Sequence, residues 1–182
     1  MTLSNKMNRY AVASISLHWG MALLIALIYA LIELREMFPR GSDFREAMKA
    51  LHFMLGLCVL ALVAVRIWLH WAHPAPPVQP PPPLWQKRAA TAMHLALMLF
   101  MVATPILGWL LLSAEGKPIP FFGLDLPPLI GVSETAAGWS EELHEALGTI
   151  GYFLIGLHTA AALYHHYFLR DNTLRRMVPH RL

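Results

Sequence analysis

Four long stretches of mostly apolar residues, separated by more polar connections, dominate the sequence. They cover residues 13–32, 51–69, 92–112 and 144–168, and each has roughly the 20 residues that a helix needs to cross the hydrocarbon core of a bilayer. Because backbone polar groups inside a bilayer must be satisfied within the segment, such stretches are expected to be helices. The pattern predicts an all-α integral membrane protein: one membrane domain over residues 1–182, built as a bundle of four transmembrane helices.

The composition supports a membrane protein rather than a soluble one. Hydrophobic residues make up 57% of the 182 residues and charged residues only 14%, whereas a soluble domain carries about 25% charged residues. The formal net charge is +3. The cations gather at the flanks of particular spans, so we interpret them as topology signals and expect a lipid bilayer, and no nucleic acid, as the partner.

Lysine and arginine positions predict how the spans are oriented. One side of the membrane receives Lys6, Arg9, Arg66, Lys87, Arg88, Arg170, Arg175, Arg176 and Arg181, and the cations on the other side are mixed with many acids. Because the cytoplasmic side carries the excess of lysine and arginine, both termini are predicted to be cytoplasmic. The expected location is the bacterial inner membrane, crossed several times.

Two connections have a distinctive composition. Residues 74–83, PAPPVQPPPP, are predicted to form an extended, polyproline-like strap on the cytoplasmic side. The connection from Ser113 to Glu142 is long enough to cover a site. Its aromatic and proline content favours an ordered cap on the opposite side of the membrane.

Histidines inside the predicted spans are the main candidates for chemistry, because polar residues within a bilayer are costly. The alternating span directions place His52 and His144 at an outer level, and His18, His94 and His158 at an inner level. On the last span, the 14 residues from His144 to His158 cover about 21 Å and end about 40° short of four full turns. Any one histidine could serve only to hydrogen-bond a neighbouring helix, but five together favour a shared function.

The outer level has the features expected of a haem site. Two opposed imidazoles on different helices of a four-helix bundle are typical of bis-histidine ligation of a haem b. A flat macrocycle needs space beside its ligands, and both outer histidines are followed four residues later by a glycine, Gly56 after His52 and Gly148 after His144. Two levels of histidines predict two haems, one above the other.

The inner level offers three histidines for one pair of ligands. His18 and His158 are each followed four residues later by alanine, whereas His94 is followed by the larger Met98. The smaller neighbours favour His18 as the partner of His158. The spacing does not exclude His94.

Three segments carry a resemblance to a known family: ISLHWG in the first span, ELREMFPRGSDFRE after it, and GYFLIGLHTAAALYHHYFLRDNTLRRMVP near the end of the chain. Together with the histidine pattern, they resemble the bacterial di-haem cytochrome b561 family over nearly the whole chain. The resemblance implies two haem b groups, with His18 and His158 as ligands on the cytoplasmic side and His52 and His144 on the periplasmic side. It also implies an enzyme that takes electrons from superoxide in the periplasm and passes them to ubiquinone.

If the chain is such an oxidoreductase, four further residues are candidates for functional roles. Arg40 and Lys49 lie near the outer level, where cations would steer an anion such as superoxide, although they could equally belong to a solvated loop whose cations pair with nearby acids. His165 lies one heptad beyond His158, about 10.5 Å deeper, where a quinone needs a hydrogen-bond partner and a proton relay; an interfacial location is the alternative. Arg66 could pair with a haem propionate or simply extend to the membrane surface.

Two other functions remain open at this stage. The chain could be a haem-bearing membrane anchor that carries electrons from a partner dehydrogenase or hydrogenase to quinone. The superoxide-oxidising enzyme, by contrast, requires no protein partner. It could also be a haem-free membrane protein whose histidines bind or transport a metal ion.

Overall fold

The computed structural model describes residues 9–178, which form four long helices with short connecting elements. The helices are α2 (Val12–Leu34), α3 (Asp43–Ala72), α4 (Leu84–Ala114) and α5 (Glu134–Tyr167). The short elements are the 3-10 helices η1 (Arg35–Met37) and η2 (Arg175–Met177) and the strands β1 (Pro120–Phe121) and β2 (Leu124–Asp125). All four long helices are long and apolar enough to cross a membrane, so the predicted all-α, four-span fold is confirmed. Lys6 and Arg181, which contribute to the predicted orientation, lie outside the described residues.

The helices extend beyond the apolar stretches, most clearly at the starts of α3 and α5. The Ser42 hydroxyl accepts a hydrogen bond from the Arg45 backbone N–H at 3.4 Å, and the Ser133 hydroxyl accepts one from Ala136 at 3.3 Å. Such N-caps satisfy backbone donors that the first helical turn leaves free. Hydropathy therefore marks the part of a helix that lies in lipid, whereas the capping residue decides where the helix begins.

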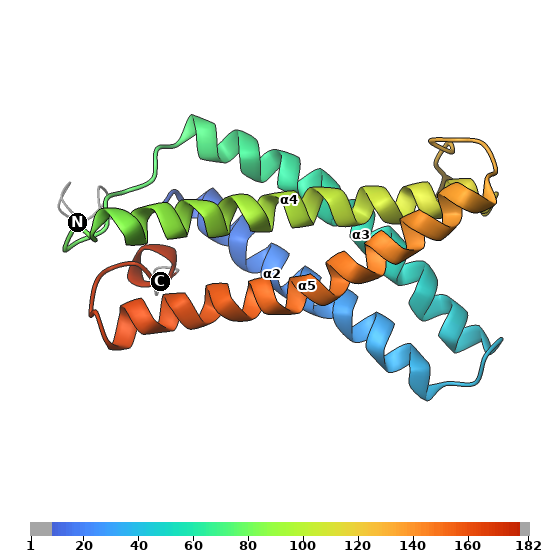
Figure 1. Cartoon of the computed structure of the whole chain (residues 1–182), viewed down its shortest axis with the longest axis horizontal. Coiled ribbons are helices and arrows are strands. Elements are labelled where there is room, and N and C mark those ends of the chain that lie inside the picture. The colour runs from blue at the N-terminus through green and yellow to red at the C-terminus, as the bar shows by residue number, and fades with distance from the viewer. Residues whose placement is uncertain (1–8, 179–182) are drawn as a thin grey trace.

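The four helices form two antiparallel hairpins that cross each other, with α2 against α3 and α4 against α5 (Figure 1). The hairpins meet mainly where α3 packs on α4. A buried cluster of Met21, Val59 and Val63 joins α2 to α3. The backbones of α2 and α5 hardly approach each other. Side chains must therefore make most of the contacts between these two helices.

Both described ends of the chain lie at the same end of the bundle (Figure 1). We call this the terminal end: α2 and α4 begin there, and α3 and α5 end there. The Pro-rich residues 74–83 cross it and bind the segment after α5, because the Gln79 N–H donates to the Asn172 side-chain oxygen at 2.8 Å and the Asn172 N–H donates to the Gln79 carbonyl at 3.1 Å. The predicted strap is thus hydrogen-bonded to the segment after α5 at the terminal end.

At the opposite end, which we call the loop end, the α4–α5 connection is ordered. It is shorter than the predicted range of 113–142, because α4 continues to Ala114 and α5 already begins at Glu134. The connection folds back as a two-stranded hairpin and buries Ile119, which is 2% exposed, against Leu57 and Leu112. Ser113 secures it by accepting a hydrogen bond from the Leu129 N–H at 3.0 Å. The cap is therefore held by both packing and hydrogen bonds.

Candidate functional site

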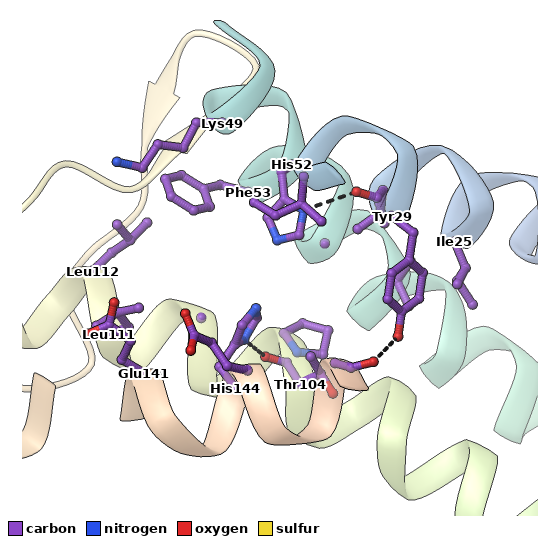
Figure 2. Close-up of a pocket in the computed structure, with 18 of the residues that line it drawn as sticks. Ile25, Tyr29, Lys49, His52, Phe53, Thr104, Leu111, Leu112, Glu141 and His144 are labelled. Atoms are coloured by element: carbon purple, nitrogen blue, oxygen red, sulfur yellow. Dashed lines mark hydrogen bonds between the residues drawn. The ribbon is translucent and has the colours of Figure 1, made fainter. Parts of the chain in front are cut away.

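A cavity of about 560 Å³ lies between the two helical hairpins, toward the loop end. His52 reaches into it from α3 and His144 from α5, and the two rings face each other across the open space (Figure 2). Their ring centres are 6.1 Å apart and their planes are inclined by 73°. A metal–imidazole bond is about 2 Å long, so two rings that ligate one metal from opposite sides have centres separated by about 6 Å. The separation therefore fits bis-histidine ligation.

Hydrogen bonds orient both rings for this role. His144 Nδ1 lies 2.9 Å from the Thr104 carbonyl oxygen, and His52 Nδ1 lies 3.3 Å from the Ile28 carbonyl oxygen. A carbonyl can only accept, so each Nδ1 carries the proton and donates it. This leaves the unprotonated Nε2 of each ring available to a metal, the arrangement usual for metal-ligating histidines.

The surroundings of the two rings leave space for a flat group. Gly56 and Gly148 both line the cavity, and a Cβ atom added to either would meet no atom within 4 Å. On α4, Gly108 gives His144 room, because a Cβ there would lie 3.2 Å from its Cε1 atom. The buried Thr104 hydroxyl, also in the cavity wall, has no hydrogen-bond partner among the described residues. Space, free ring nitrogens and an unused polar group together fit a haem.

Two tyrosines that the sequence analysis does not single out connect α2 to α5 beside this cavity. The Tyr29 hydroxyl donates to the Gly148 carbonyl at 2.6 Å, and the Tyr152 hydroxyl donates to Glu33 at 2.8 Å, with the two rings 4.3 Å apart. Inside a bilayer, such interhelical hydrogen bonds and packing hold helices together in place of the hydrophobic effect. Tyr29 lies eleven residues after His18, within about 20° of three full turns, and this spacing could have marked it as facing the bundle.

Between the two histidine levels, α5 has a glycine, Gly151, on the face that carries the histidines. Gly151 is buried against the Tyr29 hydroxyl and the Phe100 ring, and a Cβ there would lie 2.6 Å from a Phe100 carbon atom. The sequence places Gly151 on the histidine face, midway between His144 and His158, but only the structure shows which side chains occupy that position. Phe100 and Tyr29 form the layer that separates the levels.

The inner histidines gather around His158. Its ring centre lies 6.2 Å from that of His18, with planes inclined by 75°, and 5.6 Å from that of His94, with planes inclined by 67°. Arg66 is within electrostatic range of all three rings. The structure brings together every histidine assigned to this level and leaves the choice between His18 and His94 open.

The cations assigned to the outer level occupy different positions. Lys49 lines the cavity, and within residues 9–178 it makes no ion pair, whereas Arg40 is exposed in the turn after η1 and does not line the cavity. Arg45 is occupied by Glu36 and by two backbone carbonyls. Lys117 of the cap lines the cavity and pairs with Glu115 at 2.8 Å.

Acidic residues also line the cavity, so its wall carries charges of both signs. They are Glu33, Glu115, Glu141 and Glu145, beside the cations Arg35, Lys49 and Lys117. Lys49 and Glu141 come from opposite walls, as Figure 2 shows. The charges that an approaching anion meets in this cavity are therefore of both signs.

His165 lies at the terminal end and is paired with an acid that the sequence analysis does not single out. His165 Nδ1 is 2.5 Å from Asp171 Oδ2, and the Asp171 side chain is only 4% exposed. Burial raises the pKa of Asp171, but hydrogen bonds from His165 and from the Thr173 backbone outweigh it, so the pKa of this carboxyl lies below its usual range. The carboxylate is thus present in its charged form at neutral pH.

Within residues 9–178, no group of three or more His, Cys, Asp or Glu side chains is placed to hold a metal ion by itself. His52 and His144 instead form a facing pair across a cavity, and the inner histidines gather around His158, an arrangement suited to iron whose other ligands come from a macrocycle. Fold and site therefore define a four-helix membrane bundle of the haem-binding type.

Comparisons with known proteins agree with this class. The family model described as "Prokaryotic cytochrome b561" matches residues 9–180. The chain belongs to this family, whose members bind haem b, and its four spans make it a multi-pass protein of the bacterial inner membrane.

Three curated relatives cover nearly the whole chain. "Cytochrome b561 homolog 1" of Escherichia coli strain K12 is 39% identical over 96% of this chain and 99% of its own length. "Probable superoxide oxidase CybB" of Yersinia pestis is 36% identical over 94% of this chain and 96% of its own. "Cytochrome b561 homolog 2" of Escherichia coli strain K12 is 30% identical over 98% of this chain and 95% of its own.

Proposed function

We propose that this membrane oxidoreductase oxidises superoxide to oxygen at the loop end and passes the electrons through two b haems to ubiquinone. The observation that carries the proposal is the pair of histidine levels on α5, each with a ring from another helix at 5.6–6.2 Å. One level could bind a haem, but two levels provide a route along the bundle axis. The family supplies haem b.

The proposed haem ligands rest on these distances and, at the inner level, also on the small residue that follows His18 and on the family resemblance. His52 and His144 would bind the outer haem, and His18 with His158 the inner one. When bound, the haems supply reversible one-electron storage at two depths in the membrane. The protein's contribution is to present the free Nε2 atoms of the outer histidines and to hold α2 against α5 through Tyr29 and Tyr152.

The superoxide half of the reaction needs no nucleophile or general base. Each superoxide anion gives up one electron and leaves as oxygen, so the site must only attract an anion and let it approach. Lys49 fits this task because it lines the cavity and its ammonium group is not occupied by an acid within the described residues. The relative from Yersinia pestis that is called a probable superoxide oxidase supports this donor.

The quinone half of the reaction belongs at the terminal end, beside the inner histidines. Two electrons and two protons convert ubiquinone to ubiquinol, so a proton-carrying side chain is required there. His165 lies on the face of α5 that carries His158, about 10.5 Å nearer the terminal end, and its pairing with Asp171 shows that it is held in one orientation. The predicted cytoplasmic location of both termini puts this half of the reaction on the cytoplasmic side.

Replacing Lys49 with glutamate is expected to slow the second-order reduction of the protein by superoxide about tenfold at low salt, because steering by charge raises the rate of encounter. The difference should shrink above about 0.1 M salt, where the Debye length falls to ~10 Å. Stopped-flow absorbance of the haems measures the rate. Arg40→Glu is the matched variant outside the cavity and should have the smaller effect; equal effects at both positions would mean that the whole outer surface steers, and not the cavity residue.

Replacing His94 with alanine is expected to leave both haems in place, because His18 and His158 suffice as ligands. The reverse experiment, His18→Ala, should remove the inner haem. Haem counted per chain in the purified variants distinguishes the two. Loss of a haem in His94→Ala with retention in His18→Ala would reassign the inner ligand to His94, whose ring lies closer to His158.

The function itself is tested on the purified protein in three steps. A reduced-minus-oxidised spectrum with haem counted per chain should show two b haems; superoxide should reduce them; ubiquinone should reoxidise them. Haems that ignore superoxide but respond to ubiquinone would favour the membrane-anchor alternative, especially with a co-purifying dehydrogenase or hydrogenase. A preparation that binds no haem would end the proposal.

A further inference from the structure

The carboxylate of Asp171 occupies an unfavourable position for an acid. It lies at the C-terminal end of α5, where the helix dipole presents negative charge and disfavours anions. It is also nearly fully buried, and burying a charge is costly unless the charge is paired. An acid in this position needs a partner that offsets both effects, and the partner that the structure provides is His165.

The backbone after α5 turns so as to bring the Asp171 carboxylate to the Nδ1 edge of that ring. The helix ends at Tyr167, Arg170 adopts a left-handed conformation with a φ of 55°, and the Asp171 N–H returns to the His165 carbonyl at 3.2 Å. One carboxylate oxygen then accepts from His165 Nδ1 and the other from the Thr173 N–H at 2.8 Å. Both oxygens have partners, so the side chain is fixed.

The residues after this turn contact the Pro-rich strap. Asn172, the next residue, is hydrogen-bonded to Gln79 of the Pro-rich strap. The buried Arg176 donates to the Pro76 carbonyl and lies over the Tyr10 ring at 5.5 Å. The strap, the residues just before α2 and the segment after α5 are therefore joined, while the Asp171 carboxylate itself is held by His165 and by the Thr173 backbone.

A carboxylate on Nδ1 decides what the other edge of the imidazole can do. His165 Nδ1 keeps its hydrogen to donate to Asp171, so the Nε2 edge is the one that gains and loses a proton. Nε2 makes no hydrogen bond to any described residue, and the side chain is 21% exposed. The Nε2 atom of His165 is therefore free to exchange a proton, at a position about 10.5 Å beyond His158 along α5.

We propose that Asp171 is the positioning residue of the quinone site: it fixes the ring of His165 and balances the positive charge that the ring carries while it holds a proton for the quinone. This inference rests on the quinone reduction proposed above. In one turnover two superoxide anions supply two electrons, and two protons from the terminal side join the two quinone oxygens as the C=O double bonds become C–OH. His165 gives a proton from Nε2 to a quinone oxygen and recovers one from water.

The test isolates the quinone half of the reaction in the full-length, haem-loaded protein. The haems are reduced with dithionite without oxygen, mixed with a short-chain ubiquinone, and followed by absorbance as they reoxidise. Asp171→Asn keeps the shape of the side chain but removes its charge, and should slow reoxidation about 100-fold, within the range of lost acid–base catalysis. Haem content, haem spectrum and the rate of reduction by superoxide should match those of the parent protein.

Two further variants separate positioning from mere support of the fold. Asn172→Ala breaks the hydrogen bonds of its side chain to the same strap without touching His165, and should leave reoxidation within about twofold, because only side-chain hydrogen bonds are lost. In a His165→Gln background, Asp171→Asn should add no further loss, because residues that act as one unit are not additive. An equal loss in Asn172→Ala, or additive losses in the double variant, overturns the inference.

The outcomes also distinguish this inference from the function on which it rests. If parent protein that has been reduced is not reoxidised by ubiquinone, the quinone function itself is wrong. If the parent and Asp171→Asn reoxidise at the same rate, only the role of Asp171 is wrong. Should Asp171→Asn lose its haems, Asp171→Glu replaces it, with a smaller slowing that must again vanish in the His165→Gln background; a slowing that persists there overturns the inference.

Discussion

Purified His144→Ala protein is expected to contain one b haem per chain, against the two proposed for the parent protein. His144 supplies one of the two rings that face each other across the cavity, at a centre-to-centre distance of 6.1 Å. Its removal also leaves the Thr104 carbonyl without the hydrogen bond that fixes the ligand. The inner haem should remain, because His158 lies about 21 Å away along α5. The ratio of haem to protein should therefore fall by about half, because one of the two proposed bis-histidine sites is lost.

Haem extraction and counting measure this loss, and circular dichroism checks that the helices persist. His73→Ala is the control, since His73 is exposed at the terminal end, far along α3 from His52. That variant should keep both haems. Loss of both haems from a His144→Ala protein with intact helices would show that the sites do not load independently; retention of both would exclude His144 as a ligand.

The second large effect is expected from filling the cavity without touching a ligand. Gly148→Leu places a side chain into space that is empty within 4 Å of the Cβ position, and Gly148 lines the cavity one turn after His144. A leucine there should occupy volume that the outer haem requires, so that the outer haem is lost almost completely while His52 and His144 are still present. The helix contacts of α5 should persist, because the added Cβ atom meets no atom within 4 Å and overpacking penalties arise where atoms already fill the site.

Gly156→Leu is the matched control on the same helix. A Cβ at Gly156 also meets no atom within 4 Å, but Gly156 does not line the cavity. It should leave the haem count unchanged. Equal losses in the two variants would show that α5 tolerates no leucine at either glycine, and normal loading in Gly148→Leu would show that the haem lies elsewhere.

Several features of the site could be predicted from the sequence because they depend on one helix at a time. The helix period places His144, Gly148, Gly151 and His158 on one face, and the alternating directions of the spans separate the histidines into two levels. The structure places His52 against His144 and His158 among the inner histidines. Their role as ligands stays a prediction, as does the cytoplasmic location of both termini.

Other features depend on contacts between segments that are far apart in the sequence. The carbonyls of Ile28 and Thr104 that orient the outer rings carry no signal in residue type, because every residue has a carbonyl. In the sequence, Asp171 resembles an ordinary surface acid; only the turn at Arg170 brings its carboxylate to His165 Nδ1. Arg40 and Lys49 are equivalent as loop-end cations, and only the fold shows that Lys49 lines the cavity while Arg40 does not.

The sequence by itself determined that four helices cross the membrane and which face of each carries histidine, because hydropathy and the helix period are local properties. The tertiary structure decided how far apart the rings stand, which carbonyls hold them, where space is left beside them and which acid reaches His165. These quantities depend on how two helical hairpins cross and on how the segments after α4 and α5 fold back onto the bundle (Figure 1). Crossing and folding back are settled by packing and hydrogen bonds between distant residues, and no single segment of the chain encodes them.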